Sequence, residues 1–527
     1  MADYQVVIAG GGPVGLAAAV ELGRRGIHVL VIEPRVTVSH ARPRCKTVNA
    51  RSMEHLRRWG LADELRKRAP LSTDWSQDVV FCTSLTGREL SRFSGVLGLV
   101  AEGDRFPELG QQAPQYVLEE LLRDSVGDLP SCELRTGLAV TDLQQDAAGV
   151  TVTATDTHGT STRVTAEYLI GCDGPRSAVR PLIGAAYDGE HALRPNFGMV
   201  FQAPGLSELV PHGPAVHYWV INPDAPALLG PLDREGTWWM IAFGADAETG
   251  ARDAGQLIDA ATGTTTGAVI LSTDPWTARM QIADRMRDRR VFLAGDAAHL
   301  NPPLGGHGLN TGLGDAVDLG WKLAAVLDGW GGPALLDSYA GERRPIQERV
   351  IREATANMAV TSAELLADNL DAADEDGERA RLTAGERIQA TKRAEFHSLD
   401  LVLDIRIEES PVIAHNPSAL AGSRLPHAWL DGQSLYDDLG SGFTLLVLAD
   451  LAASEAVRIG QAAHSRGVPL STVNLSGHHL RDRYGADLVL VRPDQYVAWA
   501  DDLAPEPARL IDLLRGECPV ATKGATT

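Results

Sequence analysis

Apolar positions at the start of the chain form two continuous runs, at residues 6–9 and 29–32, separated by a glycine-rich turn and a stretch with helical spacing. Parallel strands covered on both faces have this pattern, because neither of their faces meets water. Residues 4–33 therefore predict a strand–helix–strand unit.

The middle of the chain predicts helices and antiparallel strands. Residues 50–68 and 115–125 have helical apolar spacing, whereas residues 149–171 alternate apolar and polar positions on both sides of a Thr-His-Gly-Thr turn, as a hairpin does. Between residues 195 and 285, short apolar runs separated by turn residues predict an antiparallel meander. Such a sheet is suited to form one wall of a pocket.

The charge content and the hydrophobic pattern change twice in the last third of the chain. Residues 361–400 are rich in charge and helical in tendency, which predicts a solvated linker or a helix pair. From about residue 422 the pattern restarts as strand, helix, strand, a further strand at residues 486–500, and helix. This part predicts a small α/β domain of its own.

Length, charge and cysteine content narrow the class of protein. A chain of 527 residues predicts two to four domains, and its net charge of -21 opposes binding to nucleic acid or to anionic membranes. No apolar run approaches a membrane span, and the first residues lack the basic stretch of a secretory signal, so we expect a cytoplasmic protein. Five scattered cysteines without a CxxC pair fit neither a disulfide framework nor a zinc knuckle.

The first glycine-rich turn carries a GxGxxG pattern formed by Gly10, Gly12 and Gly15, with Pro13 inside it and Glu33 closing the second strand. Between a strand and a helix, this pattern lets a pyrophosphate approach the helix N-terminus while the acid accepts hydrogen bonds from a ribose. A tight turn without a ligand is the alternative. The pattern predicts dinucleotide binding and does not separate NAD from FAD.

Two later segments make that distinction: residues 168–180, YLIGCDGPRSAVR, and residues 291–312, VFLAGDAAHLNPPLGGHGLNTG. With them, residues 3 to about 355 resemble the class A flavoprotein aromatic hydroxylases of the phenol and para-hydroxybenzoate hydroxylase type, including polyketide-tailoring members. The C-terminal part resembles the thioredoxin-like appendage of the phenol hydroxylase branch. Because a redox cysteine pair is absent there, we assign this part to packing or subunit contacts; a degenerate structural relic is the alternative.

The resemblance implies an α/β fold with three parts: a Rossmann-like FAD-binding domain with GxGxxG, an antiparallel β-sheet substrate domain, and a C-terminal thioredoxin-like α/β domain. We expect the following boundaries: FAD-binding domain, 1–185, with some substrate-domain strands near 76–100; substrate domain, 186–285; FAD-binding domain again, 286–360; helical linker, 361–421; thioredoxin-like domain, 422–527.

The resemblance also implies which residues meet FAD. Asp296 would bind a ribityl hydroxyl, unless it only caps a helix, and the loop after it would lie against the flavin ring with helix N–H groups that stabilise negative charge on reduced flavin. Asp173, in the DGxxSxVR pattern, serves FAD and NAD(P)H use in the family or acts as an N-cap. The expected cofactor residues are Gly10, Gly12, Pro13, Gly15, Glu33, Arg44 (phosphates), Gln115 (flavin), Asp173, Asp296, Pro303, Gly306, Gly308, Leu309 and Asn310.

Few residues are expected to act directly on the substrate, because the flavin carries the chemistry. Pro303 and Lys46 are the candidate catalytic residues; Lys46 would favour a phenolate or form an ordinary salt bridge. Alternation along the meander offers Tyr218, Trp219, Met240 and Phe243 as apolar substrate contacts, with about half of such positions on the wrong face. His299 and His307 lack a third neighbouring ligand, which favours packing over a metal site.

The expected reaction is hydroxylation of a phenolic or polyketide-like aromatic molecule. In the family, NADPH or NADH reduces FAD transiently, and the flavin then reacts with O2 to give a C4a-hydroperoxide that transfers oxygen to the ring. Baeyer–Villiger oxidation or epoxidation on the same fold is an alternative, and a flavin-binding regulatory protein without turnover is another. A homo-oligomer is possible, whereas nucleic-acid and membrane partners are not expected.

Overall fold

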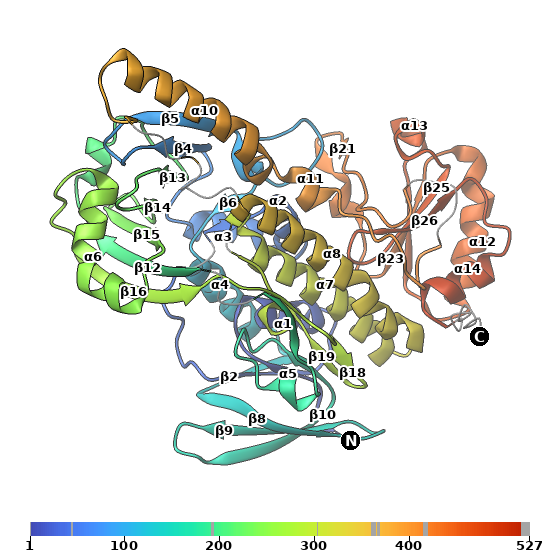
Figure 1. Cartoon of the computed structure of the whole chain (residues 1–527). Helices are drawn as coiled ribbons and strands as arrows, with labels where there is room; N and C mark the ends of the chain where they lie inside the picture. Colours follow the sequence, from blue (N-terminus) through green and yellow to red (C-terminus); the bar gives the residue numbers. More distant parts are fainter. Residues whose placement is uncertain are drawn as a thin grey trace, which may run out of the picture.

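The computed structural model describes residues 2–43, 46–190, 194–302, 304–359, 365, 369–414 and 420–517. Three bodies are visible in Figure 1: a parallel sheet with its helices at the lower centre, an antiparallel sheet at the upper left and the C-terminal domain at the right. Within the described ranges, no helix combines the length and the apolar character that a membrane crossing requires.

The parallel sheet contains five strands in the order β19-β10-β1-β2-β7, and each neighbouring pair among them is parallel. Its strands are β1 (Tyr4–Ala9), β2 (Val29–Glu33), β7 (Cys132–Thr136), β8 (Leu138–Gln145), β9 (Val150–Asp156), β10 (Ser161–Gly171), β18 (Arg287–Asp288) and β19 (Val291–Leu293). The predicted strand–helix–strand unit and the predicted hairpin, β9–β10, are both confirmed. Since β19 pairs with β10, the chain returns to this sheet after leaving it for the second one.

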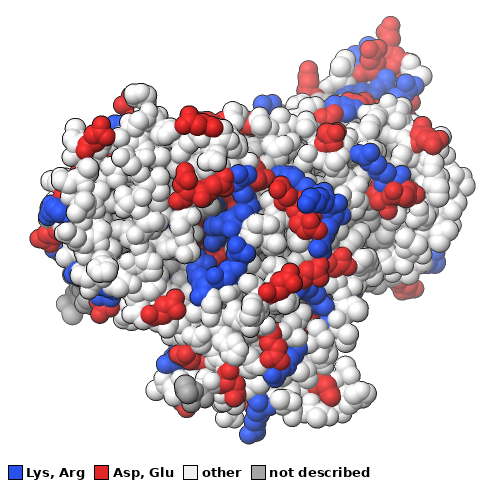
Figure 2. Space-filling model, turned by 180° about the vertical axis from the view of Figure 1, so that it is seen from behind, with Lys and Arg blue, Asp and Glu red and all other residues white. Residues whose placement is uncertain are grey.

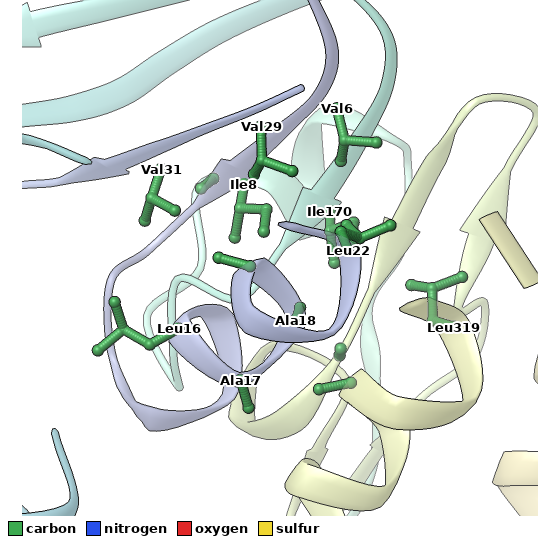
Figure 3. Close-up of a cluster of buried hydrophobic side chains, with 14 of the residues drawn as sticks. Val6, Ile8, Leu16, Ala17, Ala18, Leu22, Val29, Val31, Ile170 and Leu319 are labelled. Carbon is green, nitrogen blue, oxygen red and sulfur yellow. The ribbon is translucent and has the colours of Figure 1, made fainter. Parts of the chain in front are cut away.

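Helices cover the parallel sheet and bring its distant segments together. They are α1 (Pro13–Gly23), α2 (Ala50–Arg58), α3 (Ala62–Arg68), α4 (Gln115–Gly127), α5 (Val179–Leu182) and α7 (His307–Leu327). The segment predicted as helical, 50–68, is two helices rather than one, because Gly60 adopts a left-handed backbone conformation with φ +72° between them. Figure 3 shows small side chains of α1, including Ala17 and Ala18, packed between strand residues and Leu319 of α7.

The antiparallel sheet has the strand order β16-β12-β15-β14-β13-β4-β5. Its strands are β4 (Asp78–Cys82), β5 (Glu89–Ser94), β12 (Pro195–Gln202), β13 (His217–Val220), β14 (Ala227–Pro231), β15 (Thr237–Phe243) and β16 (Val269–Thr277). The predicted meander is confirmed as β13–β14–β15. Strands β4 and β5, from the N-terminal part of the chain, extend this sheet through the parallel pair β4–β13.

Two helices cover opposite faces of the antiparallel sheet. Helix α6 (Ala247–Thr262) packs on one face, and α10 (Glu375–Phe396) lies along the other, beside β4 and β5 in Figure 1. The charged segment expected as a linker or helix pair therefore contains a helix with buried residues, Ile388 and Phe396. Helices α8 (Pro333–Ala359) and α11 (Leu399–Leu403) flank it in the sequence.

The C-terminal domain has a four-stranded sheet in the order β24-β23-β25-β26, with β23–β24 parallel and β25–β26 antiparallel. Its elements are β23 (Phe443–Val447), α12 (Ala453–His464), β24 (Leu470–Asn474), α13 (Arg481–Tyr484), β25 (Leu488–Val491), β26 (Val497–Asp501) and α14 (Pro507–Leu514). This βαβ unit followed by a hairpin is the thioredoxin-like arrangement. The segment 486–500, expected as one strand, is the hairpin.

Short strands complete the chain. They are β3 (Thr47–Val48) with β6 (Gln111–Gln112), β11 (Tyr187–Glu190) with β17 (Met280–Ala283) and β20 (His299–Leu300), and β21 (Trp429–Leu430) with β22 (Gln433–Ser434). On the face shown in Figure 2, basic side chains gather at the centre and acidic side chains lie directly beside them. The two signs of charge are thus interspersed on this face of an acidic protein.

Candidate active site

The first glycine turn leaves open space at one of its three glycines. A Cβ added at Gly10, where φ is +102°, would lie 2.4 Å from the Cys172 carbonyl oxygen, and one at Gly15 would lie 2.0 Å from the Gly10 oxygen. A Cβ at Gly12 would meet nothing within 4 Å. Gly12 is also the N-cap of α1, where no side chain caps the helix and Pro13 begins it. Open space before uncapped N–H groups fits a pyrophosphate.

Glu33 closes β2 directly beside this turn. Its buried carboxylate accepts a hydrogen bond of 2.7 Å from the Gly11 backbone N–H and another of 2.7 Å from Nε of Arg35. The carboxylate thus holds the glycine turn in place. Because each oxygen has two lone pairs, a ribose hydroxyl has an acceptor here as well.

The second glycine-rich segment packs against the first. A Cβ at Gly295, where φ is +60°, would lie 2.9 Å from Val14, and one at Gly312 would lie 2.7 Å from the same side chain. Val14 is in the first turn of α1, so the absence of side chains lets the turn at Gly295–Ala297 and helix α7 close around it. Asp296 lies in that turn, partly exposed and not acting as a helix cap, and its carbonyl oxygen accepts the Tyr187 hydroxyl.

The N-terminus of α7 repeats the properties of α1. Its N-cap, Gly306, has φ +67° and no side-chain cap, and a Cβ at Gly306 or at Gly308 would meet nothing within 4 Å. Leu309, the next residue, packs partly on the core of the parallel sheet. Pro303 lies outside the described residues. A flat, electron-rich ring can therefore approach the backbone N–H groups at this end of the helix.

Asn310 uses its whole side-chain amide inside the protein. Its oxygen accepts from the Asn49 backbone N–H at 3.0 Å and from the Ser52 hydroxyl at 2.7 Å, while its nitrogen donates to the carbonyls of Thr47 at 3.1 Å and Gly306 at 2.7 Å. The expected cofactor contact is thus a tie between α7 and the segment at 47–52.

Two further expected cofactor residues have structural partners. Asp173 accepts from the backbone N–H groups of Ala178 and Val179, at the start of α5, at 2.7 and 3.0 Å, while its other oxygen is buried without a partner among the described residues. Gln115 begins α4, and its backbone N–H donates to the Pro43 carbonyl at 3.0 Å. Arg44 lies outside the described residues.

His299 belongs to a buried polar network that the sequence did not indicate. Its Nε2 lies 2.7 Å from Asp315 on α7, which also accepts from the backbone N–H of Gly295 at 3.1 Å, from Nε of Arg343 at 2.8 Å and from Gln347 at 3.0 Å. Burial opposes ionisation, but His299 and Arg343 lower the pKa of Asp315 to about 2. Asp315 thereby fixes the GDAAH turn to α7 and α8. In the described ranges, no group of three metal-ligating side chains is assembled.

One face of the antiparallel sheet carries an aromatic row. The rings of Phe81 and Trp219 stack at 5.6 Å and 7°, and those of Trp219 and Phe243 at 5.7 Å and 26°. Lys46 lies over the Trp239 ring on this face, with Nζ 3.8 Å from the ring centroid. Because β3 carries Thr47 and Val48, the segment that Asn310 ties to α7 also places Lys46 on the sheet.

The four side chains expected to contact substrate divide between the two faces. Trp219 and Phe243 lie on the aromatic face, whereas Tyr218 and Met240 belong to the core that packs against α6. The Tyr218 hydroxyl donates to the Gly213 carbonyl at 2.6 Å. Alternation along the strands separates them, so Tyr218 and Met240 are core residues of the far face.

Helix α10 adds two charged residues to the aromatic face. Lys392 donates to the Asn357 carbonyl at 2.6 Å and to Glu395 at 3.2 Å, and its Nζ lies 5.0 Å from the Trp219 ring centroid. The Glu395 carboxyl accepts from the Gly305 backbone N–H, and its burial raises its pKa. Both are almost fully buried. Their sequence, KRAEF, has the charge spacing of an exposed helix, so only the fold identifies them.

The aromatic face and its surroundings hold buried polar atoms without a partner among the described residues. They are the ring nitrogens Nε1 of Trp219 and Trp239, Nε2 of His217, and Oε1 of Gln112, whose amide nitrogen donates to the Val216 carbonyl. Buried polar groups are almost always satisfied in folded proteins. Their concentration here indicates that a ligand or water supplies the missing partners.

Arg51 of α2 makes contacts within its own helix and with the C-terminal domain. Its guanidinium bonds Glu54 at 2.7 Å, the Gln495 side chain at 2.5 Å and the Asp494 carbonyl at 2.6 Å. Arg51 thus joins α2 to the β25–β26 turn of the C-terminal domain. It borders a cleft between α7, α8 and α11 that His307 and Tyr496 also line.

Comparison with known proteins gives matches over nearly the whole chain. A family model described as FAD binding domain matches residues 3–354, and one described as aromatic-ring hydroxylase, C-terminal, matches residues 418–517. The tetracenomycin B2 monooxygenase-dioxygenase of Streptomyces olivaceus is 33% identical over 550 residues, which cover 97% of this chain and 97% of that protein.

Solved structures agree with these matches. The rebeccamycin biosynthetic enzyme RebC with reduced flavin is 34% identical, with a TM-score of 0.90 over 98% of this chain and 99% of that one. A ternary complex of aklavinone-11 hydroxylase with FAD and aklavinone is 28% identical, with a TM-score of 0.81 over the same shares. The similarity includes both the first sheet and the C-terminal domain.

Proposed function

Since the chain belongs to the FAD-dependent aromatic-ring hydroxylases, we propose that it hydroxylates a planar phenolic or polyketide-like molecule held on the Phe81–Trp219–Phe243 face. NADH or NADPH supplies the electrons and O2 supplies the oxygen atom. The relatives named for tetracenomycin B2 and aklavinone support a substrate of this class.

The two glycine-rich segments have the properties that FAD needs. The open space at Gly12 and the uncapped N-terminus of α1 would hold the pyrophosphate, with Glu33 at the adenosine ribose and Asp296 at the ribityl chain. Gly306 and Gly308 would lie against the flavin. When bound, FAD accepts a hydride from the nicotinamide and activates O2 for transfer to the ring.

The protein's own groups orient the reactants and exclude water. The N-terminus of α7 directs positive dipole charge toward its open side, which favours negative charge on a ring placed there. Helix α10 covers the aromatic face with Phe396 and Ile388, so a substrate on that face is shielded from solvent. No side-chain nucleophile is required in this scheme.

One observation carries the proposal: the segment at 46–52 contacts both α7, where the flavin would bind, and the antiparallel sheet, where the substrate would bind. Asn310 of α7 binds the Thr47 carbonyl, and the neighbouring Lys46 lies on Trp239 of the sheet. On the other side, Gly305 binds Glu395 of α10. A ring at the α7 N-terminus and a ring on the aromatic face would therefore be neighbours.

The test is anaerobic reduction of the FAD-loaded protein by each nucleotide in the presence of a panel of phenols and aromatic polyketides, followed by admission of oxygen. We expect faster flavin reduction with a fitting substrate and a product heavier by one oxygen atom, with the new hydroxyl on a ring carbon. A lactone or an epoxide would instead identify the two alternative oxygenations. Bound FAD that neither nucleotide reduces would favour a regulatory protein. A cytoplasmic location and a homo-oligomer stay predictions; light scattering tests the latter.

A further inference from the structure

Resting on the proposed function, we propose that Lys46, His217 and Trp239 form a subsite for an ionised oxygen of the aromatic substrate, a phenolate or the enolate of a hydroxyquinone. The subsite would select hydroxylated aromatics with an acidic hydroxyl over their methyl ethers. These three residues come from two strands of the sheet and the segment before β3.

The three side chains are neighbours. Nζ of Lys46 lies 3.8 Å from the centroid of the Trp239 ring, and the His217 ring lies 6.3 Å from the same ring in an edge-on arrangement. The Phe396 ring of α10 lies 5.8 Å from the His217 ring, at a tilt of 55°. The group is therefore bounded by the sheet, by α10 and by the segment that Asn310 ties to α7.

The hydrogen-bonding groups of this subsite are mostly donors. An indole nitrogen and an ammonium donate only, while a neutral imidazole donates once and accepts once. Nε1 of Trp239 and Nε2 of His217 are buried and have no partner among the described residues, and Trp239 as a whole is 4% exposed. A ligand that satisfies Trp239 must present an acceptor, which His217 can also meet in the tautomer with a proton on Nε2, and an ionised oxygen is the strongest acceptor available.

The charges around the subsite favour an anion. Burial and the Lys46 charge lower the pKa of His217 to about 3, so this imidazole is neutral near pH 7. Lys392 and Glu395 of α10 form an ion pair with each other, and Arg194 lies over the Phe243 ring at 5.7 Å. Lys46 therefore supplies the positive charge next to Trp239, where low solvent access strengthens its effect on an anion.

The neighbouring Trp238 offers a matched control. Its Nε1 is also buried without a partner among the described residues, but its ring lies in the core against α6, with Tyr218 at 6.3 Å. Changing Trp238 to Phe removes the same kind of donor from the opposite face of the same strand.

The experiment uses the FAD-loaded protein and 2-hydroxyanthraquinone, a dye whose colour reports the ionisation of its hydroxyl. We expect the pKa of the bound dye to fall by at least one unit relative to free dye, a tenfold preference for the anion. Lys46→Met should abolish this shift, Lys46→Arg should keep most of it, and Trp239→Phe or His217→Asn should weaken anion binding three- to tenfold. Trp238→Phe should leave the shift unchanged.

An undiminished shift in Lys46→Met, or failure of the native protein to bind the dye anion, would overturn the subsite. Melting temperature and FAD content check each variant; should Lys46→Met lose FAD, Trp239→Phe and His217→Asn decide the question. The proposed function fails independently, because it requires an oxygenated product from the native protein. Turnover without a Lys46-dependent shift would refute the subsite alone, whereas a shift without turnover of any aromatic would refute the function.

Discussion

Substituting Gly12 with Ala tests whether a glycine is required here for ligand binding or for packing of the protein. A Cβ at Gly12 meets no protein atom within 4 Å, and its φ of -79° suits alanine. Reduced freedom of the unfolded chain contributes about 0.4–1 kcal/mol of stability, and alanine's weaker N-capping costs about the same. We therefore expect the unfolding free energy of the FAD-free protein to change by less than about 1 kcal/mol.

The same methyl group would occupy the space proposed for the pyrophosphate. Backbone N–H groups reach a phosphate only at close approach, so a Cβ between them forces it outward. We expect FAD affinity to fall at least 100-fold, about 2.7 kcal/mol. Gly15→Ala is the contrasting variant: its Cβ would lie 2.0 Å from the Gly10 oxygen, which should cost about 3 kcal/mol of stability whether or not FAD is present.

Denaturant unfolding of FAD-free protein measures the unfolding free energy, and titration of flavin fluorescence measures the FAD affinity. Both must be done, since bound FAD itself raises apparent stability. Native-like FAD affinity in Gly12→Ala would refute the assignment of this space to the cofactor. A loss of stability in Gly12→Ala equal to that in Gly15→Ala would show that the open space is needed for folding instead.

Three further substitutions test the surrounding contacts. Asn310→Ala removes four hydrogen bonds, three of which join α7 to residues 47–52, so chemical unfolding should show a loss of about 2–4 kcal/mol; a loss below about 0.5 kcal/mol would contradict the tie. Asp315→Asn should cost about 3–5 kcal/mol near pH 7. The folded pKa of Asp315 is about 2 and lies below the unfolded value, so the stability difference between the native protein and Asp315→Asn should shrink as pH falls from about 4 toward 2. A stability difference independent of pH would refute the lowered pKa of Asp315. Lys392→Met leaves Glu395 buried without its cation and should lower the melting temperature, while adding Glu395→Gln should restore much of it; no recovery in the double variant would argue against the pair.

Patterns of apolar and polar residues predicted the elements of this fold because each pattern arises from the geometry of residues that are neighbours in the sequence. Continuous apolar runs identified β1 and β2, and a turn between alternating runs identified the hairpin β9–β10. The break between α2 and α3 was missed because a single glycine in a helical pattern is usually tolerated. The hairpin β25–β26 was merged into one strand, although its Arg-Pro-Asp-Gln turn sits inside the segment.

Burial of charge was the feature that the sequence did not reveal. Lys392 and Glu395 stand three apart on a helix otherwise rich in exposed charges, and only the packing of α10 on β5 places them inside. Asp315 stands in a helix whose apolar stripe indicates packing but gives no partner. In contrast, strand alternation puts His217 on the same face as Trp219, so its position was available from the sequence once the correct face was known.

The motif residues divide by how they act, and this division follows from their chemistry. The side chains of Asp173 and Asn310 form hydrogen bonds with backbone groups around the site. Gly12, Gly306 and Gly308 instead leave space in front of helix N–H groups. A dinucleotide carries its negative charge at the pyrophosphate, and a reduced flavin carries it on the ring. The two uncapped helix N-termini, from α1 and α7, would meet both needs with backbone groups alone. Motif side chains therefore act mainly by shaping the two helix ends, and substitutions that preserve those ends should preserve cofactor binding.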